Sequence, residues 1–453
     1  MSASRGHPPP ESEGDVNLSE HRRAWLDEQI DPSTRRILDE DERYFLRQSL
    51  STPCMNVLEA CDGIYLQDAQ GRRYMDFHGN SVHQVGFGHP RVVEAITEQM
   101  RKLSFCTRRY TNAVAVELAK KLVDITPGDL SKALFAPGGT SAVGLALKLA
   151  RMATGRHKTI SMWDSFHGAS LDAISIGGAA GFRRNAGPLL PGAEHVPYPH
   201  AGHCLFGCGG ECNTRCADYV EFILRNEGDI AAVIAEPTRS AAIFPPADYW
   251  RKVRDACDRY GALLIFDEIP HALGRTGRMF AYEHDGVDPD ILVLGKGLGG
   301  GIFPFAAVLA RGELDVAPDA ALGHYTHEKN PVACAAALAT LQVIEEEGLL
   351  ERSSTLGEHA LQRLRAMADR HGVIGEARGR GLLLGVELIE AGDPSKPAND
   401  LADRVMYAAL TKGLSFKVTM GNVLSLAPPL TITQDELDRA LDIVDECLRE
   451  AAG

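Results

Sequence analysis

From about residue 90 onward, the chain alternates short apolar runs with amphipathic stretches. The apolar runs have the length and composition of buried strands, and they read KALFAP, KTISM, IAAVIAEP, LLIFDE, DILVLGK and FAAVLA. Between them, stretches such as RVVEAITEQMRKL and YWRKVRDACDRYGA repeat apolar residues at helical spacing. Continuous apolar strands that alternate with helices are typical of a mainly parallel sheet covered on both faces. The pattern therefore predicts an α/β fold.

The two ends of the chain show different patterns. Residues 1–18 are polar and proline-rich, which predicts a disordered N-terminus. Residues 63–79 alternate apolar and polar positions around a turn and predict a hairpin. We expect residues 19–85 to form a smaller domain together with the helix-rich segment 331–453. Residues 86–330 would then form the large domain.

Composition and charge exclude several classes of function. The chain has 453 residues and a formal net charge of −14, with lysine and arginine scattered along its length. Scattered basic residues do not favour binding to nucleic acid. The sequence has no run of about eighteen or more apolar residues, and its first residues lack the apolar core of a secretory signal. We therefore expect a cytoplasmic protein with no membrane partner and with cysteines present as thiols.

Candidate chemistry gathers at the ends of the predicted strands. Ligands of an open parallel sheet bind beyond the carboxyl ends of its strands. The residues at these ends are Gly138-Gly139-Thr140, Phe166-His167, Glu236, Asp267 and Lys296. Each has an ordinary interpretation as well: a turn, a core aromatic, a helix cap, or a lysine whose amine reaches solvent. Their convergence on one edge of the sheet, rather than any one of them, indicates a binding site.

These residues match the parts of one cofactor, pyridoxal 5′-phosphate. An amine such as that of Lys296, placed in a partly dry pocket, can form a Schiff base with the cofactor's aldehyde. A helix that begins after Gly138 suits the phosphate, and the flat ring suits a neighbouring aromatic such as Phe166. A carboxylate such as that of Asp267 keeps the pyridine nitrogen protonated, which makes the ring an electron sink.

Over about residues 45–450 the sequence resembles the class-III aminotransferase family of pyridoxal-phosphate enzymes, which have fold type I. The resemblance is carried by motifs such as FHGNSVHQVGFGHPRVVEAI, FAPGGTSAVGLALKLAR, PDILVLGKGLGGG, NPVACAAALATL and RGRGLLLGVEL. It implies an enzyme with a large domain built on a mainly parallel sheet of the seven-stranded type. It also implies a smaller α+β domain formed by both termini.

The resemblance implies a role for individual residues. The cofactor-binding residues would be Gly139, Thr140, Phe166, His167, Asp267, Ile269, Lys296 and Thr326. Lys296 would carry the cofactor and move protons, and Asp267 would bind the pyridine nitrogen, so these two are the predicted catalytic residues. Thr326 would reach the phosphate in the neighbouring subunit, which implies a homodimer with shared active sites. No metal is expected at the active site.

Two departures from the family pattern bear on the reaction. Pro270 stands where the family often has a glutamine, and the loop TRSAAIFPP after Glu236-Pro237 lacks the family's glutamate. In the amine transaminases of the family, that glutamate covers the arginine that matches Arg378 and pairs with a substrate carboxylate. We therefore expect Arg378 to stay open to anions. Such a site suits one small amine that carries a permanent anionic group.

The preferred hypothesis is an elimination of ammonia. Stretches such as SMWDSFHGASLDAISIGG and LGHYTHEKNP resemble a branch of the family that acts in phosphonate catabolism. Its members release ammonia from (R)-1-hydroxy-2-aminoethylphosphonate and give phosphonoacetaldehyde. The alternative is a transaminase that moves an amino group from an amino acid or ω-amine to a 2-oxo acid. Arg378, Arg108, Arg109 and Lys417 are candidate phosphonate contacts because cations pair with a dianion, although such residues are also common on solvated surfaces.

A second cluster lies in the segment HCLFGCGGECNTRC, where Cys204, Cys208, Cys212 and Cys216 follow one another at intervals of four. Four thiolates so close together could hold zinc as a structural staple. The usual zinc pattern has shorter spacings between paired cysteines, so the sequence leaves this question open.

Overall fold

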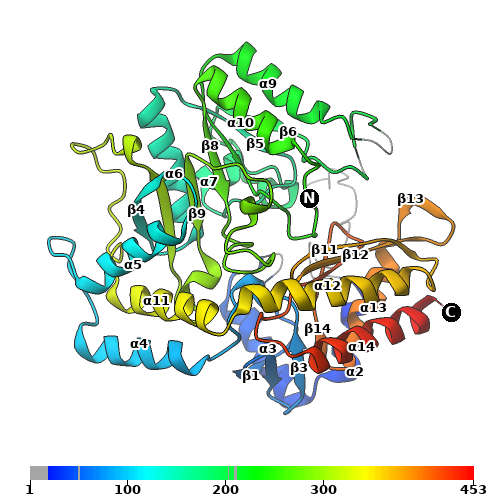
Figure 1. Ribbon diagram of the computed structural model, residues 1–453. Helices are drawn as coiled ribbons and strands as arrows, with labels where there is room; N and C mark the ends of the chain where they lie inside the picture. The colour runs from blue at the N-terminus through cyan, green and yellow to red at the C-terminus, as the bar shows by residue number, and fades with distance from the viewer. Residues whose placement is uncertain (1–18, 49–50, 203, 209–211, 453) are drawn as a thin grey trace, which may run out of the picture. The chain divides into compact units, whose positions relative to one another are not determined.

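The computed structural model describes residues 19–48, 51–202, 204–208 and 212–452, which form two compact units (Figure 1). One unit takes its described residues from within Met1–Gly79, Ser240–Ala242 and Glu351–Gly453, and the other takes its described residues from within Asn80–Arg239 and Ile243–Leu350. The segment predicted to be disordered, residues 1–18, lies outside the described residues.

The second unit is built on a seven-stranded sheet with the order β4-β10-β9-β8-β7-β5-β6. Its strands are β4 (Leu130–Ala136), β5 (Lys158–Met162), β6 (Ala193–Val196), β7 (Ile230–Ala235), β8 (Leu263–Asp267), β9 (Ile291–Leu294) and β10 (Ala306–Arg311). Strands β6, β5, β7, β8 and β9 pair in parallel, whereas β10 is antiparallel to both of its neighbours. The predicted α/β fold with a mainly parallel sheet is thus confirmed.

The helices of this unit pack onto the sheet or onto one another. They are α4 (Pro90–Lys102), α5 (Ala113–Ile125), α6 (Gly139–Thr154), α7 (Leu171–Ile176), α8 (Ala180–Arg183), α9 (Arg215–Glu227), α10 (Tyr249–Tyr260) and α11 (Pro331–Glu346), with 3-10 helices η2 (Ala281–His284), η3 (Lys296–Gly299) and η4 (Gly312–Leu314). Helices α5, α6 and α10 pack onto the sheet, and α4 packs onto α11. Helix α6 lies against the sheet in Figure 1, and its small residues Ala142, Ala146 and Ala150 belong to one buried core with β7, β8, β9 and β10. Small side chains let the helix backbone approach the strands closely, which fixes its N-terminus at the carboxyl ends of the strands.

Caps in the sequence set where these helices begin and end. The side chain of Asn112 accepts a hydrogen bond from the backbone of Ala115 and so starts α5. Asn330 caps α11 in the same way, with Pro331 at the first helical position. The sequence predicts α11 in the smaller domain, whereas the structure places it in the second unit. The predicted domain limits remain a prediction.

The first unit combines both ends of the chain. One sheet has the order β1 (Leu58–Asp62), β2 (Tyr65–Asp68), β3 (Arg73–Asp76) and β14 (Leu414–Ser415), and the other contains β11 (Ile374–Arg380), β12 (Leu383–Glu390), β16 (Val423–Leu426) and β15 (Lys417–Thr419), with β13 (Asp393–Pro397) beside β12. The helices are α2 (Glu20–Gln29), α3 (Pro32–Tyr44), α13 (Asn399–Thr411) and α14 (Gln434–Ala452), together with most of α12 (Leu349–Ala368). The 3-10 helix η1 (Gly79–Ser81) stands at the boundary of the two units.

Contacts between distant parts of the sequence hold this unit together. The predicted hairpin is present as β2 and β3, and β3 pairs in parallel with β14, so that Met75 lies beside Leu414. The indole of Trp25 on α2 donates a hydrogen bond to Thr411 at the end of α13. Among the described residues, no helix is long and apolar enough to cross a membrane.

Candidate functional site

Lys296 occupies a tight turn at the carboxyl end of β9. Gly295 precedes it in an extended conformation, and Lys296 itself has a φ of 46°, in the left-handed region. A left-handed conformation is unusual for a residue with a side chain and is found mostly at turns and functional sites. The chain then forms η3 and returns as β10. The lysine side chain is only partly buried, whereas the residues on both sides of it are fully buried.

Asp267 ends the neighbouring strand β8 and pairs with His167. Its Oδ2 lies 2.7 Å from Nδ1 of His167, and its Oδ1 accepts a hydrogen bond of 3.1 Å from the backbone of Ile269. Both side chains are buried. The other ring nitrogen of His167, Nε2, is buried and has no hydrogen-bond partner among the described residues. A buried polar atom of this kind normally has a hydrogen-bond partner. We therefore expect Nε2 of His167 to contact a bound group.

Glu236, after β7, adds a second buried carboxylate to this region. Burial raises the pKa of Glu236, while the positive charges of Arg239, His167 and Lys296 oppose the rise. The Nε atom of Arg239 lies 3.7 Å from Glu236, and Nη1 donates to the backbone oxygen of Trp163 at 3.1 Å. Arg239 therefore ties the loop after β7 to the loop after β5.

The phosphate end of the predicted site is shaped by glycines. A methyl group placed on Gly139, at the start of α6, would lie 2.8 Å from Cδ1 of Ile269, and one placed on Gly295 would lie 3.3 Å from Cγ2 of the same residue. A methyl group on Gly168 would meet Oγ1 of Thr140 at 2.3 Å. The backbone is thus kept close on both sides of Ile269, with helix N–H groups exposed for an anion.

These features fit pyridoxal phosphate. The unit provides a strand-end amine, a buried carboxylate supported by a histidine, an apolar side chain at Ile269, and a glycine-lined helix N-terminus. Phe166 lies beside them in sequence, but its ring is 39% exposed and packs on Phe182, with centroids 4.3 Å apart. Its contact with the cofactor ring stays a prediction.

The predicted substrate-binding residues come from both units: Arg378 and Lys417 from the first, and Arg108 and Arg109 from the second. Arg378, on β11 of the first unit, is held by other residues: its Nη1 lies 2.7 Å from Glu376 and 2.6 Å from Glu387, and Nε donates to the backbone oxygen of Ala241. These contacts use Nη1 and Nε, and the binding of an anion by Arg378 stays a prediction. Its Nη2 atom is nevertheless buried without a hydrogen-bond partner among the described residues. Lys417 lies on β15 of the same unit.

Arg108, Arg109 and Thr326 are exposed side chains of the second unit. The guanidinium group of Arg108 contacts the imidazole ring of His324. Their predicted roles in binding the phosphonate or the neighbouring subunit's phosphate remain predictions.

Two polar residues that the sequence pattern does not single out, Gln84 and His271, lie near Lys296. The amide of Gln84 is 1% exposed, and neither its oxygen nor its nitrogen has a hydrogen-bond partner among the described residues. It lies so close to Gly297 that a methyl group there would be 1.9 Å from the amide oxygen. His271 is also buried, and burial lowers its pKa, as do the charges of Lys296 and Arg275. Gln84 is a polar residue within the apolar, glycine-rich segment SVHQVGFGHP, and this position in the sequence is the signal that could have revealed it.

The profile of the class-III aminotransferases matches residues 47–448. The chain belongs to this family. It is 46% identical to an (R)-1-hydroxy-2-aminoethylphosphonate ammonia-lyase from Vibrio splendidus, over 96% of this chain and 95% of that protein. It is 36% identical to a leucine/methionine racemase from Thermococcus litoralis, over 91% of this chain and 95% of that protein.

Solved structures of aminotransferases have the same fold. An aminotransferase from Bacillus anthracis matches with a TM-score of 0.86 at 30% identity, over 93% of this chain and 100% of that one. An amine transaminase from an uncultivated Pseudomonas species, in its pyridoxal-phosphate-bound form, matches with a TM-score of 0.84 at 31% identity, over 90% and 99%. The protein is thus an enzyme of fold type I that uses pyridoxal 5′-phosphate.

Proposed function

We propose that this enzyme eliminates ammonia from (R)-1-hydroxy-2-aminoethylphosphonate and gives phosphonoacetaldehyde. The observation that carries the proposal is the 46% identity, across almost the whole of both chains, to an ammonia-lyase named for that substrate. The loop after Glu236 supports it, because it lacks the glutamate with which the amine transaminases of the family alternate between two kinds of substrate.

Pyridoxal phosphate, when bound, supplies an aldehyde that condenses with the substrate amine and a protonated ring that accepts the electron pair left by proton removal. The residues that would hold it are Asp267 at the pyridine nitrogen, Ile269 against the ring, and the backbone of Gly139 and Thr140 at the phosphate. His167, fixed by its 2.7 Å contact, orients the Asp267 carboxylate.

Lys296 is the proton carrier of the reaction. Its amine takes a proton from the carbon that bears nitrogen, and the hydroxyl group on the neighbouring carbon leaves with a proton as water. The released enamine takes up water and separates into phosphonoacetaldehyde and ammonia. The water lost in the elimination is regained in the hydrolysis, so the atoms of the two products add up to those of the substrate and there is no net redox change.

The phosphonate needs cations that stay charged at neutral pH. Arg378 is the first candidate, since its Nη2 remains available while Glu376 and Glu387 hold the rest of the group in place. Arg109 and Lys417 are further candidates, on the strength of the sequence alone. Guanidinium groups pair with dianions through two parallel hydrogen bonds.

The active unit is proposed to be a cytoplasmic homodimer with shared active sites. Thr326, which matches the family's threonine that reaches the neighbouring phosphate, is exposed on the described surface and so is accessible to a second copy. The absence of a membrane-spanning helix among the described residues is compatible with this location.

A transaminase is the second candidate function. The chain is 39% identical to an acetylornithine aminotransferase from Methanopyrus kandleri, over 86% of this chain and 93% of that protein. That relative favours the transfer of an amino group from an amino acid or ω-amine to a 2-oxo acid.

One assay separates the two functions. Purified enzyme is mixed with the racemic hydroxyphosphonate, and ammonia and phosphonoacetaldehyde are measured without any added 2-oxo acid. We expect both products in equal amounts, no ammonia from plain 2-aminoethylphosphonate, and no ammonia with the Lys296→Ala variant. Formation of glutamate from an amine donor and 2-oxoglutarate, with no ammonia from the hydroxyphosphonate, would establish the transaminase instead.

A further inference from the structure

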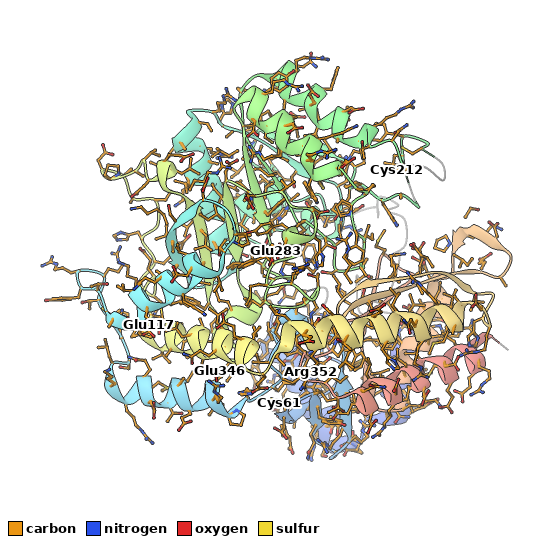
Figure 2. All side chains as sticks on the ribbon, in the orientation of Figure 1. Cys61, Glu117, Cys212, Glu283, Glu346 and Arg352 are labelled. Carbon is orange, nitrogen blue, oxygen red and sulfur yellow. The ribbon has the colours of Figure 1, made fainter. Side chains whose placement is uncertain are left out.

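Four cysteines lie close together in the sequence, from the loop after β6 into the first turn of α9, outside the catalytic site. Cys204, Cys208 and Cys212 are half-buried, and Cys216 is buried in the first turn of α9. Figure 2 labels Cys212 on the loop that leads into this helix. None of the chemistry derived above uses any of them.

Two of these thiols are already in contact. The sulfur atoms of Cys204 and Cys208 are 3.2 Å apart, and both residues are present as thiols. A disulfide would need a separation of about 2.05 Å. Two thiolates bound to one tetrahedral zinc ion, at about 2.3 Å each, lie roughly 3.8 Å apart. The observed separation is therefore closer to that of two ligands of one ion than to that of a covalent bond.

The other two thiols lie in the same electrostatic neighbourhood. Cys216 interacts electrostatically with both Cys212 and Cys204, so the three thiols lie near one another. Among the described residues no three of these sulfur atoms lie within 4.8 Å of one another, so a bound ion must draw Cys212 and Cys216 toward the first pair.

We propose that Cys204, Cys208, Cys212 and Cys216 bind one Zn²⁺ ion as four thiolate ligands. Four sulfur ligands fill a tetrahedral site and leave no open position, so the ion is a structural one and not a catalyst. Thiolates are soft ligands, which select zinc over magnesium or calcium.

The position of the segment indicates which part of the protein a structural zinc ion would stabilise. Tyr198, six residues before Cys204, donates a hydrogen bond to the backbone oxygen of Pro237, and the guanidinium group of Arg239 lies 5.3 Å from its ring. The zinc site would therefore anchor a segment that packs against the loop carrying Glu236. This stabilising role does not depend on which reaction the enzyme catalyses.

The test measures metal in the holoenzyme. The full chain is produced with zinc in the medium, purified without chelators, and analysed for metals by mass spectrometry. We expect about one zinc ion per chain in the wild type. In the double variant Cys204→Ser/Cys208→Ser, zinc should be lost while the cofactor absorbance remains, which shows that the variant is folded. Cys61 is an exposed thiol on β1 (Figure 2), so Cys61→Ser is the matched control. This variant should keep its zinc.

A second measurement on the wild type avoids dependence on the variants. Titration of the native protein with a mercurial in the presence of a zinc-sensitive dye should release the metal in step with modification of these four thiols. Wild-type protein without zinc, iron with visible charge-transfer absorption in its place, two disulfides found by peptide mass analysis, or zinc retained by the double variant would each overturn the proposal.

Discussion

Asp267 and Glu268 are consecutive buried carboxylates with different hydrogen-bond partners. The side chain of Asp267 meets His167, whereas that of Glu268 accepts hydrogen bonds from the backbones of Ala281 and Tyr282, at 2.8 and 2.7 Å. One acid thus lies at the predicted cofactor site, and the other holds the backbone of η2. The two residues should respond differently to the same substitution.

Asp267→Asn should abolish most of the activity while the chain stays folded. An amide cannot hold a proton on the pyridine nitrogen, and the loss of a positioned acid–base group costs at least about a hundredfold in kcat. Initial rates of ammonia release and the absorbance of bound cofactor would measure the effect. Asp255→Asn, on the exposed face of α10, is the control and should behave as the wild type. A rate close to the wild type in Asp267→Asn would contradict the assignment.

Glu268 should make stability depend on pH. Burial raises its pKa to about 8 from 4.5, so the folded protein keeps a proton that the unfolded chain loses. The unfolded state then binds fewer protons between these values, and stability falls as pH rises from about 5 to 8. Thermal midpoints of the holoenzyme across this range would show the decline, which Glu268→Gln should reduce. Glu98→Gln, exposed on α4, should leave the slope as it is; an unchanged slope in Glu268→Gln would refute the prediction.

Gly168→Ala should destabilise the enzyme and lower its affinity for the cofactor. Gly168 has a φ of 127°, and a methyl group there would lie 2.3 Å from Oγ1 of Thr140 and 3.0 Å from its Cα. A strained backbone of this kind costs on the order of 1–3 kcal/mol. Denaturation midpoints and cofactor titrations would report both effects. Gly181→Ala, where nothing lies within 4 Å of the new atom, should be nearly neutral, and equal behaviour of the two variants would rule the argument out.

Arg378→Ala should lower stability as well as substrate affinity. The substitution leaves Glu387, a buried carboxylate, without the guanidinium partner it now has at 2.6 Å. Breaking a buried ion pair from one side costs about 3–5 kcal/mol.

The exposed Arg109 provides the comparison. Arg109→Ala should leave the unfolding midpoint unchanged and raise only KM. A double variant, Arg378→Ala/Glu387→Ala, should be less destabilised than the sum of the single variants, because the pair is lost together. Additive losses would show that the two residues do not interact.

The sheet was predictable from the sequence except for one strand. The six apolar runs are β4, β5, β7, β8, β9 and β10, because buried strands in a parallel sheet are apolar on both faces. Strand β6 was missed, since its four residues, Ala193–Val196, include a glutamate and a histidine and it lies at the edge. Edge strands need less apolar surface and give a weaker pattern.

The surroundings of Arg378 could not be predicted in the same way. Glu376 and Glu387 lie on different strands, and they become neighbours because β11 and β12 pair with Glu376 opposite Glu387. Strand register depends on the packing of the whole sheet, so a local sequence motif does not predict it. Lys296 and Asp267, in contrast, were predictable because each follows directly after an apolar run.

The wedge of Ile269 between Gly139 and Gly295 links three positions that are far apart in the chain. A side chain added at either glycine must push against the isoleucine, so a change at one position is tolerable only with a compensating change at another. Directed-evolution libraries that aim to give this enzyme new substrates should therefore treat the three codons as a single block and place their diversity elsewhere.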